Sequence, residues 1–154
     1  MSTVYLDTSA LVKLYVTEEG SEWVRDLLSY SRHPIAFTSH LTVVETACAF
    51  ARKRREDFLS PDDHMEVLLA FDHDVAYWFN ILDVTPEVIE TAKLFAGDHP
   101  LRAYDAVHLA TAWLANRQLV LAEQPPLTFV CADKPLLQIA EAVGLPIDNP
   151  ENYP

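Results

Sequence analysis

Two short β-rich runs in this chain each end close to an aspartate and lead into a helical pattern, and this arrangement restricts the fold more than any other feature. Residues 4–6 precede Asp7, and residues 127–131 are followed closely by Asp133. Beyond each aspartate, apolar residues recur at helical spacing. Strands that feed helices form mostly parallel sheets, and ligands bind at the carboxyl ends of such strands. The sequence therefore predicts an α/β fold with both aspartates at the ligand-binding edge.

The same periodicity along the whole chain predicts alternating strands and helices. We expect strands at 3–7, 35–38, 81–84 and 127–132, helices at 9–16, 20–30, 40–54, 61–78, 86–96, 103–116 and 135–143, and a short last strand near Ile147. Ser60 and Thr85 each stand before a proline, as a helix cap before the first turn. We expect the tail at 149–154 to be loose.

Length and composition predict a single domain spanning residues 1–154. Half of the residues are apolar, which suffices for a continuous core without disulfides. Cys48 and Cys131 lack the spacing of a zinc site, so we expect both to be reduced and buried. The chain shows neither a signal-peptide pattern nor an apolar run long enough to span a membrane. We therefore expect a cytoplasmic protein with no membrane partner.

Two further acids, Glu45 and Asp105, lie within predicted helices beside apolar residues. Glu45 adjoins a stripe that we expect to face the core. The stripe consists of Leu41, Val44, Cys48 and Ala51. Asp105 shares a helix face with Leu101, His108, Leu109 and Ala112. Both carboxylates are therefore predicted to lean toward the interior.

Taken one at a time, each of the four acids has an ordinary explanation. Asp7 and Asp133 fit helix N-caps, and Glu45 and Asp105 fit the edges of amphipathic helices. Their joint occurrence favours a divalent-metal site, because clustered carboxylates repel one another unless a cation binds them. Hard oxygen ligands suit Mg²⁺ or Mn²⁺, whereas zinc prefers histidine and cysteine.

Four segments in order resemble the successive motifs of PIN-domain ribonucleases, especially the VapC-type toxins of toxin–antitoxin pairs. The segments are YLDTSALVKLY (5–15), TVVE (42–45), AYDAVHLATA (103–112) and CADKPL (131–136). The resemblance covers nearly the whole chain. It implies a PIN-like three-layer sandwich, with helices flanking a mostly parallel central sheet, and a metal-dependent endoribonuclease that cleaves single-stranded RNA.

By position, Asp7, Glu45 and Asp105 match the three core acids of that family, and Asp133 matches its more variable fourth acid. The resemblance implies that these four residues are catalytic and hold Mg²⁺ or Mn²⁺. A metal there lowers the pKa of a coordinated water and offsets charge on the phosphate oxygens. The predicted reaction is in-line hydrolysis of a phosphodiester without a covalent enzyme intermediate.

Five more residues are weaker candidates for contacting ligand or substrate. Thr8, Ser9 and Ser39 carry hydroxyls that suit a ligand site, although helix capping explains each at least as well. His108 lies one turn beyond Asp105 and could orient that carboxylate, or it could be an ordinary buried histidine. Arg102 could contact a phosphate or simply be an exposed arginine.

The overall charge opposes binding of nucleic acid. A formal net charge of −12 repels a polyanion at long range. The local exception is the basic run of Arg52, Lys53, Arg54 and Arg55 at the end of a helix. Such a run stabilises a helix end through the helix dipole, and it is also a candidate contact for RNA.

The resemblance also implies protein partners, namely a cognate antitoxin whose tail covers the acids with an arginine or lysine, and a second copy in a homodimer. Two other protein classes share part of this pattern. A haloacid-dehalogenase phosphatase needs a second aspartate where this chain has Ser9, which argues against it. A catalytically silent PIN-like binding module is the remaining alternative, and it would be expected to lack one of the core acids.

Overall fold

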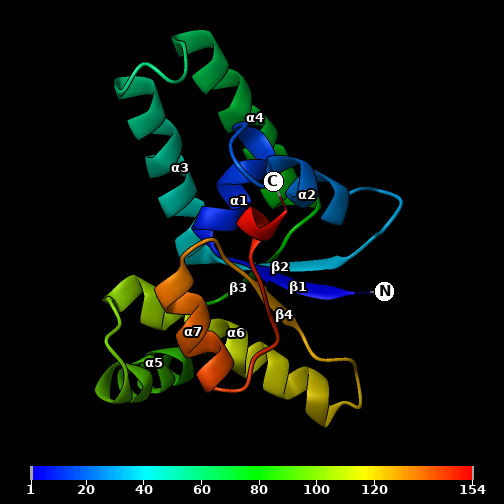
Figure 1. Ribbon diagram of the computed structural model, residues 1–154, viewed down its shortest axis with the longest axis vertical. Helices are drawn as coiled ribbons and strands as arrows, with labels where there is room; N and C mark the ends of the chain where they lie inside the picture. Colours follow the sequence, from blue (N-terminus) through cyan, green and yellow to red (C-terminus); the bar gives the residue numbers. More distant parts are fainter. Residues whose placement is uncertain (1, 154) are drawn as a thin grey trace.

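The computed structural model describes residues 2–153, and within them five parallel strands form one sheet in the order β3–β2–β1–β4–β5 (Figure 1). The strands are β1 (Thr3–Leu6), β2 (Ile35–Ser39), β3 (Asn80–Leu82), β4 (Thr128–Val130) and β5 (Ile147–Asp148). The helices are α1 (Thr8–Tyr15), α2 (Ser21–Leu27), α3 (His40–Arg55), α4 (Pro61–Tyr77), α5 (Pro86–Asp98), α6 (Ala103–Leu121) and α7 (Lys134–Ala142), followed by a 3₁₀ turn at Pro150–Asn152.

The helices cover both faces of the sheet, with α1–α4 on one side and α5–α7 on the other (Figure 1). Side chains of β1 alternate between the two layers. Val4 and Leu6 pack in a core with Leu11 from α1, whereas Tyr5 packs in a second core with Leu109 from α6. The central strand is therefore buried on both faces, and the predicted three-layer α/β sandwich is confirmed.

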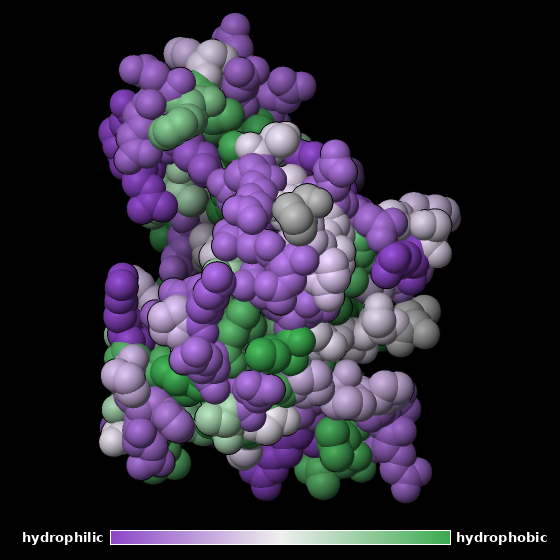
Figure 2. Space-filling model, in the orientation of Figure 1, coloured by the Kyte–Doolittle hydropathy of each residue, from purple (hydrophilic) through white to green (hydrophobic). Residues whose placement is uncertain are grey.

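Helices α3 and α4 form an arm that projects from the rest of the molecule (Figure 1). Phe71 of α4 is buried at the base of the arm, where it packs edge-on against Phe50 of α3 and Tyr15 of α1. Apolar side chains interrupt the hydrophilic surface toward the end of the arm (Figure 2). Phe58, between the two helices, is exposed there.

All the predicted elements are present, and most differ from the prediction at one or two terminal residues. The largest difference is in α6, which we expected to end at 116 and which continues to Leu121. Asn116 accepts a hydrogen bond from the backbone N–H of Leu127 at 2.8 Å, which fastens this part of the helix to the chain entering β4.

The predicted inward face of α3 is wrong. Val44 is 62% exposed and Cys48 is also exposed, although Cys131 is buried as expected. The buried face of α3 is instead made by Thr42, Thr46, Ala49 and Phe50. Both stripes have helical spacing, and hydropathy alone favours the outer one because it is the more apolar. Threonines occupy the inner positions where the helix begins beside the sheet.

Residues 149–153 of the tail that we expected to be loose are docked on the helical layer, and Pro154 lies outside the described residues. Pro150 is buried, and the ring of Tyr153 stacks on Trp23 of α2 with centroids 4.8 Å apart. Gly20, with a positive φ of 81°, lies so close that a Cβ atom there would stand 2.5 Å from the carbonyl oxygen of Pro150. The absence of a side chain at Gly20 therefore permits this docking.

Within residues 2–153, no helix combines the length and the apolarity needed to cross a bilayer. The cytoplasmic location stays a prediction.

Replacing Gly20 by alanine should destabilise the fold by about 1–3 kcal/mol, because the new Cβ meets the Pro150 backbone and the left-handed φ is strained. Urea unfolding measures the change. Gly97→Ala is the matched control: Gly97 lies in α5 with open space around it, so this variant should gain about 0.5–1 kcal/mol. Equal stability of Gly20→Ala and the parent protein would contradict the docking of the tail.

Candidate active site

Four carboxylates from four separate segments line one cavity of about 490 Å³. Asp7 follows β1, Asp133 lies just beyond β4, Glu45 is in α3 after β2, and Asp105 is in the first turn of α6. Strands β1 and β4 are neighbours where the chain order of the sheet reverses, which is the place where open α/β sheets bind ligands. In the space-filling view a hollow separates the half built by α3 and α4 from the half built by α5–α7 (Figure 2).

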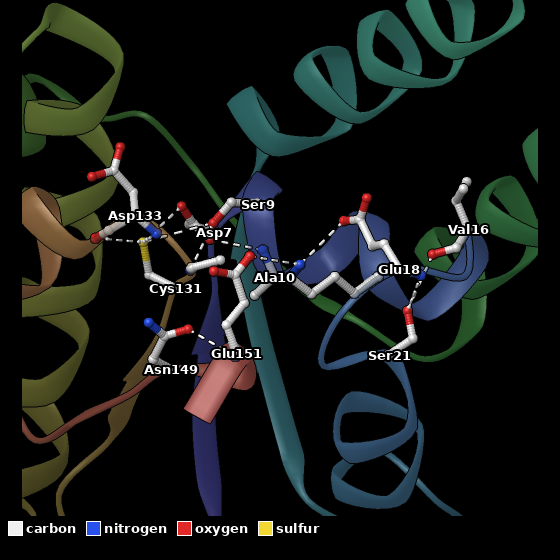
Figure 3. A network of polar contacts seen from close by, with 12 residues as sticks. Asp7, Ser9, Ala10, Val16, Glu18, Ser21, Cys131, Asp133, Asn149 and Glu151 are labelled. Atoms are coloured by element: carbon white, nitrogen blue, oxygen red, sulfur yellow. Dashed lines mark hydrogen bonds and ion pairs between the residues drawn. The ribbon is translucent and has the colours of Figure 1, made fainter. Parts of the chain in front are cut away.

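Asp7 is the most constrained of the four acids and is only 6% exposed. Its Oδ1 accepts the backbone N–H of Ala10 at 3.0 Å and the hydroxyl of Ser9 at 2.7 Å, and its Oδ2 accepts the thiol of Cys131 at 3.1 Å (Figure 3). Burial raises the pKa of Asp7, and this effect exceeds the lowering by His108 and by the three donors. Asp7 is therefore both a helix cap and a wall of the cavity.

Asp133 has the same double position. Its Oδ1 accepts the backbone N–H of Leu136 at 3.1 Å and caps α7. Asp105 is half-buried, and burial raises its pKa. The charge of Asp133 raises it further, His108 lowers it, and Asp7 and Arg102 have smaller effects in opposite directions, so the net shift is upward. Among the four acids, Asp105 is therefore the one whose pKa the neighbouring carboxylates raise most clearly.

Glu45 is held by a chain of hydrogen bonds that ends in the core. Its Oε1 bonds to Nε2 of His108 and accepts the hydroxyl of Thr8 at 3.1 Å. His108, only 2% exposed, contacts the hydroxyl of Tyr5 through Nδ1 at 2.8 Å. Burial raises the pKa of Glu45, but the bond and charge of His108 and the hydroxyl of Thr8 outweigh it, so the net shift is downward. His108 thus bonds to Glu45, whereas the sequence had suggested Asp105.

The other predicted residues separate into two groups. Thr8, Ser9 and Arg52 line the cavity with the acids, and Arg102 lines an adjoining pocket together with Asp105 and Asp133. The remaining three do not contribute to the cavity in the part of the chain that the structure describes. Ser39 caps α3, its Oγ accepting the N–H of Leu41 at 3.1 Å, and Arg54 and Arg55 are exposed.

Comparison with known proteins agrees with this geometry. The model of the PIN domain family matches residues 4–123. The chain belongs to the PIN-domain family.

Similar proteins include the ribonuclease VapC35 of Mycobacterium tuberculosis, which is 31% identical over 147 residues that cover 96% of each chain. Among solved structures, the crystal structure of FitAcB from Neisseria gonorrhoeae aligns with a TM-score of 0.66 at 18% identity, over 96% of this chain and 97% of that one. A toxin–antitoxin complex from Klebsiella pneumoniae aligns with a TM-score of 0.61 at 17% identity, over 96% and 97%.

A network of lysines and glutamates forms another wall of this PIN domain's cavity, and the sequence reasoning missed it. Lys13 is 3% exposed, and its ammonium lies 3.3 Å from Glu18 and 3.1 Å from Glu151 of the docked tail. Lys53 pairs with the other oxygen of Glu18 at 3.1 Å. Figure 3 shows Glu18 and Glu151 on opposite sides of this network. The available signal was a lysine set among the apolar residues of α1.

The donors in the cavity suit a hard divalent cation, because its acid wall consists of carboxylates and hydroxyls. As the side chains stand, no group of three His, Cys, Asp or Glu residues among 2–153 is spaced to hold a metal directly. Mg²⁺ commonly keeps several waters and uses only one or two carboxylates, so this spacing is compatible with a largely hydrated ion. The residues of this PIN domain therefore fit Mg²⁺ or Mn²⁺.

Asp105→Asn should raise the melting temperature of the metal-free protein at pH 7. The raised pKa of Asp105 means that the folded state favours its protonated form, so ionisation costs stability as pH rises through the folded pKa. The gain should shrink as pH falls toward about 4, where the carboxyl is protonated in the unfolded chain too.

Thermal unfolding in EDTA between pH 4 and pH 8 measures this effect. Glu66→Gln, an exposed acid on α4, is the control and should show no comparable gain. A lower melting temperature of Asp105→Asn at pH 7 would mean that the four acids do not repel one another as described.

Proposed function

We propose that this PIN domain is a Mg²⁺- or Mn²⁺-dependent endoribonuclease that hydrolyses single-stranded RNA, and that it is the toxin of a toxin–antitoxin pair. The observation that carries the proposal is the convergence of Asp7, Glu45, Asp105 and Asp133 on one cavity at the carboxyl edge of the sheet. The VapC ribonuclease relative supports the same reaction. A silent binding module is less well supported, because all four acids are present.

The four acids differ in how firmly they are held, and we assign their roles accordingly. Asp7 and Glu45 are fixed by hydrogen bonds from Ser9, Cys131, Thr8 and His108, so they would provide rigid carboxylate oxygens for the ion. Asp133 uses Oδ1 for its helix cap, so Oδ2 would be the oxygen that it offers to the ion. Asp105, with its raised pKa, gains most from a cation. When bound, the ion would activate water and offset charge on the phosphate.

Basic side chains at the cavity offset part of the charge that opposes RNA. Arg52 is exposed and lines the cavity beside Lys53. Both lysines of the cavity are already paired with glutamates. Arg52 is therefore the better candidate for binding a phosphate. Arg102, near Asp105, is a second candidate from the opposite side of the site.

The proposed partners are an antitoxin and a second copy of the chain. The toxin–antitoxin complex among the solved structures with this fold supports the first. An acid-lined cavity also suits a basic side chain of an antitoxin, which would compete with the metal for the same carboxylates. A homodimer remains our proposal on the strength of the family resemblance alone.

Cleavage assays test the activity. The purified chain, free of antitoxin, should cut a mixed pool of single-stranded RNA in Mg²⁺ or Mn²⁺ and not in EDTA. Asp105→Asn and Glu45→Gln should each lower the rate by at least about 100-fold, the usual scale for losing a group that stabilises the transition state. Glu66→Gln should cut like the parent protein.

Calorimetric titration with Mg²⁺ complements the cleavage assay. A nuclease should bind the ion, whereas a folded protein that binds no metal would favour the binding module; absence of cleavage from a metal-bound protein would also count against the nuclease.

The salt dependence of RNA binding tests Arg52. Arg52→Gln should weaken binding to single-stranded RNA and reduce the slope of log K against log salt by roughly 0.7, the value for one lost phosphate contact on a single strand. Arg54→Gln, two residues along the same helix and outside the cavity, is the matched control. Equal slopes for the two variants would exclude a specific role for Arg52. The assay uses the Asp105→Asn background so that the RNA stays intact.

A further inference from the structure

An apolar groove lies on the exposed face of α3, where the sequence had predicted core packing. Its walls are Leu41, Val44, Cys48 and Tyr104, and its volume is about 300 Å³. Val44 is 62% exposed and Tyr104 is 61% exposed. Pockets of this volume are at the lower end of those that hold small organic ligands. Exposed apolar side chains gathered in a concave patch mark a surface that another molecule covers.

The groove continues directly into the acid cavity. Thr8, Glu45, Ala49 and Arg52 line both. The connection also follows the chain, since Val44 adjoins Glu45 and Tyr104 adjoins Asp105. A single molecule can therefore place one group in the groove and a neighbouring group at the carboxylates.

We infer that the groove holds one nucleobase of a single-stranded RNA, on the nucleotide next to the phosphate that is cut. This inference rests on the proposed nuclease function and adds a base subsite to it. Tyr104 offers an aromatic face, and base–aromatic stacking is the usual way in which proteins hold unpaired bases. Leu41, Val44 and Cys48 supply apolar walls for the other face and edges of the base.

A cation at the groove favours a nucleotide over an apolar peptide side chain. Glu45 and Arg52 both line the groove; the carboxylate of Glu45 bonds to His108, whereas Arg52 is exposed at the junction with the acid cavity, where a phosphate attached to the seated base would lie. An apolar peptide would cover the walls and leave this guanidinium without an anion. The arrangement also explains a preference for single strands, because a base inside a duplex is stacked and paired and cannot enter a side pocket.

Cys48 permits a footprint of the groove, because it is exposed in the groove wall while Cys131 is buried. The Asp105→Asn protein with Mg²⁺ would be alkylated with N-ethylmaleimide, alone and with a saturating random single-stranded RNA of 12 nucleotides, and the peptides followed by mass spectrometry. We expect RNA to slow alkylation of Cys48 by about five-fold or more, the scale of stacking one base. A duplex or an abasic strand of the same length should leave Cys48 reactive, and unreacted Cys131 reports that the protein stays folded.

Variants of the aromatic wall give a second measurement, by fluorescence anisotropy with a labelled single strand. Tyr104→Ser should weaken binding by about five-fold or more, whereas Tyr104→Phe keeps the ring and should bind like the parent protein. Tyr77→Ser, another exposed tyrosine at the end of α4, is the control and should have no effect.

Three outcomes would overturn the inference. Equal protection of Cys48 by abasic and intact strands would mean that only the RNA backbone passes over the groove. Protection that rises with protein concentration in the absence of RNA would mean that a second copy covers it. Active cleavage by the parent protein with Cys48 fully reactive would refute the base subsite alone, whereas failure of the parent protein to bind or cut RNA would refute the proposed function as well.

Discussion

Repulsion among carboxylates gathered at one edge of the sheet is the constraint to which the rest of the site responds. Asp7 is buried and accepts hydrogen bonds from three donors. Glu45 bonds to His108, which in turn contacts the hydroxyl of Tyr5 in the central strand. These hydrogen bonds stabilise charge that burial disfavours. Asp105 lacks comparable support, and burial, together with the charge of Asp133, raises its pKa. The divalent cation that we propose for this site would relieve the same repulsion.

The parallel sheet accounts for the meeting of these acids. All five strands within residues 2–153 point the same way, so the chain leaves β1, β2 and β4 at one edge. Register brings Leu6 beside Val130, and Asp7 therefore begins next to the segment that leads to Asp133. The amide of Asp7 donates to the carbonyl of Val130 at 3.2 Å and continues the ladder into the site. The position of the cavity is a consequence of strand order and not of any single contact.

The cavity is completed by parts of the chain that lie far from its motifs. Lys13, buried in α1, ties the tail to the first helix through Glu151 and meets Glu18 on its other side. The tail reaches this position because Gly20 leaves room for Pro150 and because Trp23 stacks on Tyr153. The tail therefore adds the carboxylate of Glu151, which neutralises a lysine at the wall of the cavity. The docked C-terminal turn is thus part of the electrostatics of the site.

The sequence by itself determined the order and type of the elements and the four acids of the cavity, because periodicity, helix caps and strand-end aspartates are local signals. Tertiary structure decided which stripe of α3 is buried, since Leu41, Val44 and Cys48 have the same spacing as the threonine stripe and only packing against neighbouring elements separates them. It also decided that His108 bonds to Glu45, 63 residues away, and that Glu151 reaches Lys13. Such pairings depend on how the helical layers pack against the sheet, and residue spacing along the sequence does not predict them.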